Sequence, residues 1–386
     1  MDTPFIYDSF VSGKNFIGRR EELSKLETII REGGNAVLIE PERSGKTSLV
    51  QQALYNLRTA GKRFLSVEVS LLNIRTVADF CMRLGDSMLR AVCSTPDEFR
   101  RTVESLLCGT HFVFDPDEYS KKDRILSLSW DIDSEDVRAV LSLPYRLCPQ
   151  GESFHVIIDQ FQNIMLTENG ESLINTFEEV LQAAKDTARG RGSYILLGSG
   201  VNAMDEIFER RKRFFRLVER VKFSDVDERE IVDHIVKGFL TGGKVVDRDL
   251  AASAVRLFRN NLWEINHFCA ICDSLAHGYV MEPILNEGLD KILAVNEPRF
   301  ISIMNDLTTF QICLLRAICD GHTKFSSADI ISHYNLSSSA NVRRIKDALS
   351  KKEIVCFRSD GLEESPRIID PLFEYWLRKR YFEILK

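Results

Sequence analysis

The sequence predicts an α/β fold: a parallel sheet in the first half of the chain, then an all-helical region and a small C-terminal unit of helices and a β-hairpin. Short β-branched runs alternate with amphipathic stretches from Ala36 to about Ser224, which is the pattern of a parallel sheet with crossover helices. From Asp225 onward the strand signals disappear and apolar residues recur at helical spacing. Near the end, two short β-branched runs flank the turn residues Asp360 and Gly361.

Four apolar runs are the candidate strands of the sheet, and each is bounded by glycine or polar residues. They read NAVLIE, RFLSVEVSL, SFHVIID and GSYILLGSG, at residues 35–40, 63–71, 153–159 and 192–200. Their largely apolar character suits central strands that are buried on both faces. More residues separate the second run from the third than one crossover helix needs, and the polar part at residues 115–137 predicts a surface excursion within residues 97–150.

The second half of the chain predicts two further units. Helical spacing with short breaks predicts a compact helical subdomain at residues 225–304, which includes DEREIVDHIVKGFL, DRDLAASAVRLF and LWEINHFCAICDSLA. Residues 305–386 contain LTTFQICLLRAI, SSADIISHY and SSSANVRRIKDALSKKEIV, followed by IVCFRSDGLEESPRIIDP. Three helices followed by a hairpin are typical of a winged helix.

Composition limits the class of protein and its surroundings. A chain of 386 residues with 44% hydrophobic residues predicts two or three well-packed domains. We expect a cytoplasmic protein without membrane insertion, because residues 1–14 lack an apolar signal and no later run approaches about 20 apolar residues. Cys269 and Cys272, two of nine scattered cysteines, are interpreted as packed thiols rather than metal ligands. The net charge of -6 argues against a general nucleic-acid coat but allows a local basic patch.

The stretch LIEPERSGKTSLV, residues 38–50, ends as a phosphate-binding loop does and follows a candidate strand. Gly45 would let the backbone approach phosphates, Lys46 would reach the β- and γ-phosphates, and the Thr47 hydroxyl can hold Mg²⁺. Glu40 replaces the first glycine of the usual motif, and we expect turn strain rather than lost phosphate contact, with Pro41 fixing the loop. The alternative is a chance match at an unrelated strand–helix junction. The predicted ATP-binding residues of this loop are Glu42, Arg43, Ser44, Gly45, Lys46, Thr47 and Ser48.

Two later strand ends complete the predicted site. The run FHVIID ends in Asp159, which would hold Mg²⁺ through water, on a strand that we expect to be adjacent to the loop's strand. Gln160 follows it, and an amide cannot accept a proton, so we expect the general-base step to be lost or weakened. Ser199 ends the next run and is predicted to sense the γ-phosphate, the alternative being an ordinary serine in a turn.

Two basic segments are candidate interaction surfaces. The first lies in IFERRKRFFRLVERVKF, where one cation could be an arginine finger for a neighbouring subunit, although a solvated basic helix face is the favoured interpretation. Its cations are Arg210, Arg211, Lys212, Arg213, Arg216 and Arg220. The second is the helix predicted at residues 337–352, where Arg343, Arg344 and Lys346 could contact DNA phosphates. The alternative is that this helix packs on neighbouring helices or binds a protein.

Five stretches together resemble the archaeal-type ATPases. They are FIGRREEL at residues 16–23, the loop at 40–48, IIDQFQNI at 157–164, LLGSGVNAM at 196–204 and RIIDPLFEYWLRKR at 367–380. This family of AAA+/STAND-type P-loop proteins has a helical lid and a C-terminal winged helix and is related to origin-recognition ATPases. The resemblance implies a segment at 1–14, a nucleotide-binding domain at 15–224, a lid at 225–304 and a winged helix at 305–386.

The resemblance also implies roles for particular residues. Phe16, Ile17, Gly18 and Arg19 would line the adenine pocket. In hydrolysing members a glutamate occupies the place of Gln160, so we expect an ATP- and Mg²⁺-dependent switch with weak or absent hydrolysis. No arginine falls at the usual contact position of the lid, where Arg256 and Arg259 lie a turn earlier. The expected partners are ATP and ADP, DNA through the winged helix, and a protein partner or a second copy. The alternative function is a DNA- or protein-binding module in which nucleotide is only structural.

Overall fold

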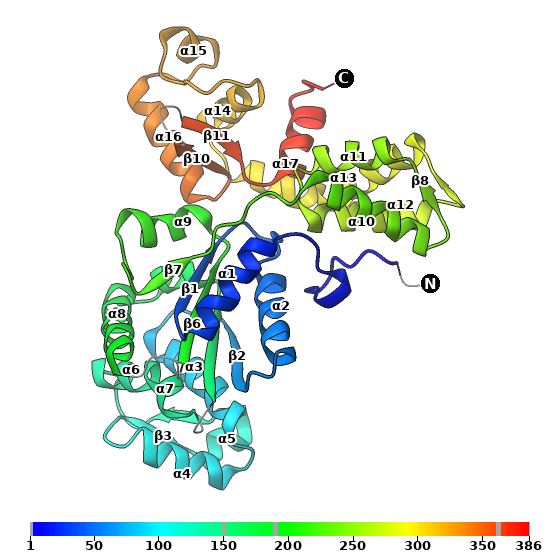
Figure 1. The fold of residues 1–386 in the computed structure, drawn as a ribbon. Coiled ribbons are helices and arrows are strands. Elements are labelled where there is room, and N and C mark those ends of the chain that lie inside the picture. Colours follow the sequence, from blue (N-terminus) through cyan, green and yellow to red (C-terminus); the bar gives the residue numbers. More distant parts are fainter. Residues whose placement is uncertain (1–2, 149–151, 188–191, 360–363, 386) are drawn as a thin grey trace. The chain divides into compact units, whose positions relative to one another are not determined.

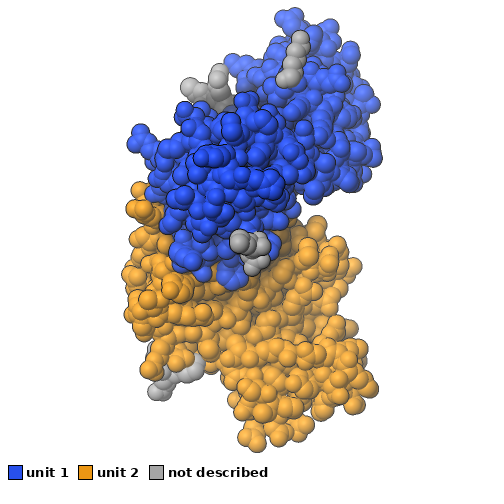
Figure 2. Space-filling view, turned by 90° about the vertical axis from the view of Figure 1, so that its right-hand side faces the viewer, with its two compact units in different colours: residues 1–18, 43–45, 225–386 blue, residues 19–42, 46–224 orange. Residues whose placement is uncertain are grey.

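The computed structural model describes residues 3–148, 152–187, 192–359 and 364–385. The chain forms two compact units (Figure 2). One, the sheet unit, comprises residues 19–42 and 46–224, and the other, the helical unit, comprises residues 1–18, 43–45 and 225–386. Within the described part of the chain, no helix is both long enough and apolar enough to cross a membrane.

A five-stranded parallel sheet forms the centre of the sheet unit (Figure 1). Its strands follow the order β2-β5-β6-β1-β7. They are β1 (Asn35–Ile39), β2 (Phe64–Ser70), β5 (Ser153–Asp159), β6 (Gly192–Gly198) and β7 (Val218–Arg220). The predicted parallel sheet is confirmed, and all residues of β6 are buried, as expected for a central strand.

The prediction for the basic segment before residue 224 is wrong, because this segment is not one helix. It contains α9 (Val201–Asp205), the short helix η3 (Glu206–Arg210) and then β7, which pairs with β1 through Asn35 and Val218. The edge strand β7 therefore consists of three residues whose local sequence gives no clear strand pattern.

In the sheet unit α1 (Arg20–Arg31) precedes the first strand. The strands are then connected through α2 (Lys46–Thr59), α3 (Val77–Val92) and α8 (Gly170–Thr187). Between β2 and β5 the chain also forms α4 (Pro96–Leu106), β3 (Phe112–Phe114), α5 (Pro116–Lys122), β4 (Leu126–Leu128), α6 (Ser134–Leu141) and α7 (Leu143–Arg146).

The predicted surface excursion is only partly at the surface. Ile125 and Leu126 are fully buried, and Leu126 packs against Gly85 of α3. A Cβ atom at Gly85 would lie 2.3 Å from Cδ1 of Leu126, so glycine is needed for this close approach. Two backbone N–H groups, those of Ile125 and Leu126, donate to the Asp86 carboxylate at 3.2 and 2.7 Å. The segment is thus anchored to α3 by packing and by hydrogen bonds.

The helical unit contains the predicted helices and a small hairpin. Its first helices are α10 (Glu228–Thr241), α11 (Arg248–Leu257), α12 (Leu262–Leu275) and α13 (Glu282–Asn305). The pairing of β8 (Val245–Val246) with β9 (Tyr279–Val280) was not predicted. The C-terminal elements are α14 (Thr309–Cys319), α15 (Ala328–His333), α16 (Ser339–Lys351), β10 (Val355–Ser359), β11 (Glu364–Ile368), α17 (Pro371–Trp376) and η4 (Leu377–Tyr381). The predicted turn at Asp360 and Gly361 lies outside the described residues.

The N-terminal segment contributes to the core of the helical unit. The Phe5 side chain is 1% exposed, and its ring centroid lies 4.8 Å from that of Phe239. A Cβ atom at Gly238 would lie 2.5 Å from the Phe5 ring, so α10 provides a glycine where this ring approaches. Asn266 of α12 donates to the Ile6 carbonyl at 3.1 Å, which fixes the same segment by its backbone.

Candidate nucleotide-binding site

The loop between β1 and α2 has two residues in the left-handed backbone region. Arg43 has a φ of 61° and Gly45 a φ of 93°. Gly45 adopts this conformation without steric cost, whereas a non-glycine residue there costs on the order of 1–3 kcal/mol. Arg43 therefore needs compensating contacts, which its side chain makes elsewhere.

Lys46 is buried at the first position of α2. Its side-chain amine donates to the carbonyl oxygens of Glu40 and Pro41, both at 2.7 Å, and the residue is 6% exposed. Burial lowers the pKa of Lys46 to about 8, while the charges of Asp159, Glu40 and Glu42 oppose that decrease. The loop thus encloses a cation satisfied by carbonyl oxygens, and a phosphate oxygen would be a stronger acceptor for it. Thr47 and Ser48 follow in the first turn of α2, both partly buried.

Glu40 connects the loop to the edge of the sheet. Its carboxylate accepts a hydrogen bond from the backbone N–H of Phe223 at 3.1 Å, and its own backbone N–H donates to the Gly198 carbonyl at 3.3 Å. These bonds link the end of β1 to the end of β6 and to the segment after β7. A side chain at the place of the usual glycine therefore has a structural partner of its own.

Asp159 ends β5, and β6 lies between β5 and the loop's strand β1. The expected adjacency of these two strands is therefore wrong. Burial raises the pKa of Asp159, and the backbone N–H of Gln160 and the charge of Lys46 oppose that increase. The carboxylate and the amine thus lie close enough to interact across the intervening strand end.

Gln160 and Ser199 lie together, joined by a residue that the sequence did not single out. Gln160 has a φ of 57°, and its amide Nε2 donates to Ser199 Oγ at 3.4 Å. Gln162 donates to Gln160 Oε1 at 2.5 Å and accepts from the Ser199 backbone N–H at 3.3 Å. The three residues form one hydrogen-bonded cluster at the ends of β5 and β6. The amide in the motif DQFQN was the available signal for Gln162.

Glu68 of β2 was also missed. Burial and the neighbouring charge of Asp159 raise the pKa of its carboxyl group, while a hydrogen bond from Gln51 lowers it. That bond, from Nε2 of Gln51 to Oε2 of Glu68, is 3.2 Å long. Glu68 is thus a second carboxyl group within electrostatic range of Asp159.

The four residues predicted for the adenine pocket are divided between the two units. Phe16, Ile17 and Gly18 are partly buried in the helical unit, where a Cβ atom at Gly18 would lie 2.5 Å from Val226. Arg19 belongs to the sheet unit, and its guanidinium donates to the Ser224 carbonyl at 2.9 Å. Their role in adenine binding stays a prediction.

The arginines near the start of α12 have partners within the helical unit. Arg256 pairs with Glu228 at 3.0 Å. Arg259 pairs with Glu374 of α17 and donates to the Ile368 carbonyl at 3.3 Å. Arg259 thus links the end of α11 to the C-terminal elements.

The basic residues of α16 are not equivalent. Arg343 and Arg344 are exposed, whereas Lys346 is partly buried and its amine lies 4.9 Å from the centroid of the Phe357 ring in β10. Two of the three predicted phosphate contacts are thus at the surface, and the third lies against the hairpin.

Three arginines of the basic segment, Arg220 of β7 among them, pair with carboxylates within the sheet unit. Arg211 and Arg213 both pair with Glu171 of α8, and Arg213 does so at 2.9 Å. Arg220 pairs with Asp205 at 3.1 Å and with Glu209 at 2.6 Å. The favoured interpretation as a helix face is therefore wrong for these three arginines, none of which lies in a helix, although the Arg211 side chain is 43% exposed.

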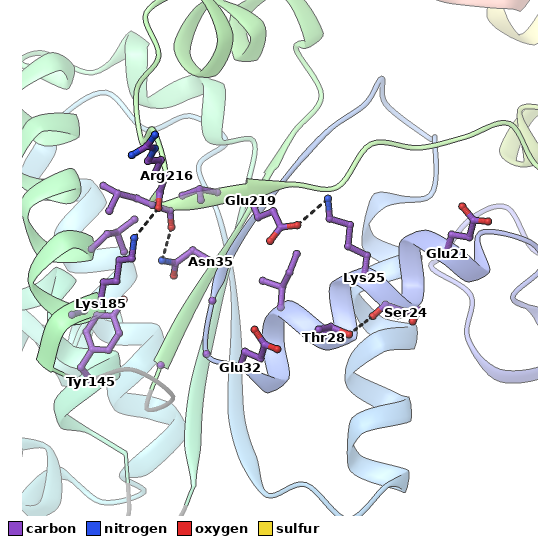
Figure 3. Close-up of a pocket in the computed structure, with 18 of the residues that line it drawn as sticks. Glu21, Ser24, Lys25, Thr28, Glu32, Asn35, Tyr145, Lys185, Arg216 and Glu219 are labelled. Atoms are coloured by element: carbon purple, nitrogen blue, oxygen red, sulfur yellow. Dashed lines mark hydrogen bonds and ion pairs between the residues drawn. The ribbon is translucent and has the colours of Figure 1, made fainter.

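A cavity of about 880 Å³ lies at the amino end of β1, the end opposite the loop (Figure 3). Lys25 and Glu219 form an ion pair of 3.0 Å at its wall, and Lys185 donates to the Arg216 carbonyl at 3.3 Å. Asn35 donates to the Leu217 carbonyl at 3.1 Å. The cavity is thus lined by charges of both signs, and it contains none of the residues predicted to bind nucleotide, Mg²⁺ or DNA.

Comparison with known proteins agrees with this architecture. Residues 298–379 match a family described as a probable winged helix domain. No curated protein sequence matches the chain. The Walker-type ATPase PABY2304 of Pyrococcus abyssi has a similar structure, with 16% identity, a TM-score of 0.64 and coverage of 97% of this chain and 99% of that one.

Two structures of the Aeropyrum pernix ORC2 protein are also similar. The complex with ADPNP and ADP has 13% identity, a TM-score of 0.52 and coverage of 93% of each chain. The ADP form has 11% identity, a TM-score of 0.53 and coverage of 99% of this chain and 96% of that one. The chain thus has the α/β fold of archaeal Walker-type and ORC-type ATPases with a C-terminal winged helix, and the expected resemblance is confirmed at the level of fold.

Proposed function

We propose that this chain binds Mg²⁺-ATP at the loop of residues 42–48 and acts as a nucleotide-dependent switch with weak or absent hydrolysis. The observation that carries the proposal is the buried Lys46 amine, which is held by two loop carbonyl oxygens within electrostatic range of Asp159. Binding of Mg²⁺ with a nucleotide phosphate requires an amine for the phosphate oxygens and a hydroxyl and a carboxylate for the metal ion. The fold shared with ATPases supports the same proposal.

The residues of the chain would divide the work of binding. Lys46 would release its carbonyl oxygens and donate to the β- and γ-phosphate oxygens, whose charge favours the protonated amine. The Thr47 hydroxyl and the Asp159 carboxylate would hold Mg²⁺, the latter through water. The bound magnesium ion would neutralise phosphate charge. The backbone N–H groups at the start of α2 would orient the phosphates.

Melting experiments test nucleotide binding. We expect Mg²⁺-ATP to raise the melting temperature, because a ligand at a hundredfold excess over its dissociation constant stabilises the native state by about 2.7 kcal/mol. Lys46→Ala should abolish the increase, whereas Lys62→Ala, which changes an exposed lysine after α2, should retain it. Equal responses of wild type and Lys46→Ala would show that the loop is wrongly assigned. Equal shifts with ATP and ADP would favour the structural role for nucleotide.

The weak hydrolysis is assigned to Gln160. Its amide is engaged with Gln162 and Ser199, and it can orient water without accepting a proton. Loss of a general base typically lowers a rate by about 10²–10⁴-fold, so Gln160→Glu should raise phosphate release strongly. Glu40→Gly should raise it little, because the Glu40 carboxylate bonds to the Phe223 backbone. A strong increase of phosphate release in Glu40→Gly, with none in Gln160→Glu, would show that the loop rather than Gln160 limits hydrolysis.

A second function, DNA binding by the winged helix, is favoured by the exposed Arg343 and Arg344 of α16. Phosphate contacts by such residues would make affinity fall with salt. The competing use of this helix, binding of a protein or of a second copy, predicts no detectable DNA binding at low salt. We propose a cytoplasmic location for either role.

A further inference from the structure

The cavity at the amino end of β1 is lined only by residues of the sheet unit and lies away from the phosphate loop. Its volume of about 880 Å³ falls in the range of about 300–1,000 Å³ that is typical of small-molecule sites. Its walls come from α1, α8 and the chain that leads into β7 (Figure 3). Buried apolar side chains of Ile29, Leu181 and Ala184 line it. The cavity therefore has the size and the apolar surface to hold a small organic molecule.

A buried tyrosine lines this cavity with an unpaired hydroxyl group. Tyr145 of α7 is 9% exposed, and among the described residues its hydroxyl has no hydrogen-bond partner. The ring centroid of the neighbouring buried Tyr194 lies 6.4 Å away, and that residue donates its own hydroxyl to the Leu141 carbonyl at 2.7 Å. Buried polar groups are nearly always hydrogen-bonded, because an unpaired one costs stability. The Tyr145 hydroxyl is thus a group that a bound molecule would satisfy.

Two cations of the lining, Lys185 of α8 and Arg216 before β7, have no carboxylate partner among the residues that the structure describes. The Lys185 amine donates to the Arg216 carbonyl oxygen at 3.3 Å, which leaves its charge without a counterion. The Arg216 side chain is exposed, and its guanidinium lies 5.1 Å from the centroid of the Phe215 ring. An anionic group can therefore approach this end of the cavity without displacing a carboxylate.

The carboxylates that line the cavity do not neutralise these two cations. Glu219 pairs instead with Lys25 of α1, at 3.0 Å. Glu21 lies in α1 and Glu32 directly follows it, and Figure 3 shows both apart from Lys185. The side of the cavity at α8 is therefore cationic.

Hydrogen bonds and close packing fix the wall beside this cationic side. Asn35 donates to the Leu217 carbonyl at 3.1 Å and accepts from the Tyr194 backbone N–H at 2.8 Å, so its amide holds the chain before β7 against β1 and β6. A Cβ atom at Gly192 would lie 3.1 Å from Cδ1 of Tyr145, so glycine leaves room for the tyrosine ring. A preformed wall lowers the cost of ordering groups around a ligand.

We propose that this cavity is a second binding site of the chain and takes a small organic acid with an apolar body. The acidic group accepts hydrogen bonds from the Tyr145 hydroxyl and the Lys185 ammonium group, and the apolar body covers Leu181 and Ala184. Burial raises the pKa of Tyr145, so the hydroxyl keeps the proton that it donates. The site does not depend on the proposed nucleotide binding, because none of its lining residues belongs to the phosphate loop.

Fluorescence titration of the full chain with anilinonaphthalene sulfonate tests the site, because this probe joins an aromatic body to an anionic group. Tyr145→Phe removes only the unpaired hydroxyl, and Lys185→Met keeps the apolar stem without the charge. We expect each change to weaken binding of the sulfonate about tenfold, the effect of losing one hydrogen bond to a charged group. Binding of phenylnaphthylamine, the neutral counterpart without the sulfonate, should be unchanged in both variants.

Lys121→Met is the matched control, because it removes an exposed lysine of α5 that does not line the cavity, and it should bind both probes as wild type does. Melting curves without a probe check the fold, and Tyr145→Phe should melt as wild type does because no hydrogen bond of the described chain is lost.

Three outcomes would overturn the proposal. Equal affinity of wild type and both variants for the sulfonate would show that the probe binds elsewhere on the chain. Equal losses for the sulfonate and its neutral counterpart would show an apolar cavity without a preference for acids. Absence of sulfonate binding to wild type would refute the site outright. Since these titrations contain no nucleotide, a failure of ATP to raise the melting temperature would refute the proposed function and leave this site standing.

Discussion

Replacing Glu264 by glutamine should remove a loss of stability that the helical unit suffers as pH rises. Burial and the charge of Asp370 raise the pKa of this carboxyl group to about 7 in the folded chain, against an ordinary value of 4.5. A group whose pKa is raised on folding binds more protons in the native state, so its contribution to stability falls as pH rises from about 4.5 to 7. Because one pKa unit corresponds to about 1.4 kcal/mol, the ionised carboxylate costs roughly 3 kcal/mol above that range.

Glutamine keeps the shape of the side chain and carries no charge at any pH. We expect Glu264→Gln to melt at nearly the same temperature as wild type near pH 4.5 and at a higher temperature at pH 8. For a unit of this size, 1 kcal/mol shifts the midpoint by about 2–4 °C, so the gain at pH 8 should be roughly 6–12 °C. Melting curves across this pH range, with Glu282→Gln at the exposed start of α13 as control, measure it.

The difference between the melting temperatures of wild type and Glu264→Gln reports on Glu264 alone, because the other carboxylates titrate equally in both proteins. A constant difference from pH 4.5 to 8 would refute the reasoning, since it would show that folding does not change the pKa of Glu264. A larger effect in Glu282→Gln than in Glu264→Gln would refute it as well.

Two further predictions concern DNA and packing. Replacing Arg343 and Arg344 together by alanine should reduce the slope of log DNA affinity against log salt concentration by an amount that corresponds to about two released ions. An unchanged slope would show that neither residue contacts DNA phosphates. Gly85→Ala should lower the free energy of unfolding, measured by urea titration, by about 1–3 kcal/mol, because its Cβ atom would overlap Leu126. Ser87→Ala on the same helix should have little effect. Similar changes in the two variants would contradict the packing argument.

The strands of the sheet could be predicted where their own residues show burial. The runs that became β1, β5 and β6 are largely apolar, because a central parallel strand is covered on both faces. The strand β7 has three residues, none fully buried, and forms because it pairs with β1. Its partner lies far away in sequence, so local periodicity does not reveal it.

The same distinction holds for the candidate site. The loop, Asp159 and Gln160 belong to short motifs whose chemistry is readable from neighbouring residues. The contact of Arg43 with Trp263 joins residues far apart in sequence, and the bond between Glu40 and Phe223 does the same. These contacts could be identified only in the folded structure, because no local sequence pattern distinguishes such side chains from ordinary surface and core residues.

The packing of Phe5 against α10 means that separate lengths of chain build the core of the helical unit. A fragment that begins at Asp225 would lack Phe5 and so leave an unfilled space beside Gly238 and Phe239. It would also lose the acceptor that Ile6 provides for Asn266. Expression of the C-terminal half by itself should therefore give a less stable product than one in which residues 1–18 are rejoined to it through a flexible connector.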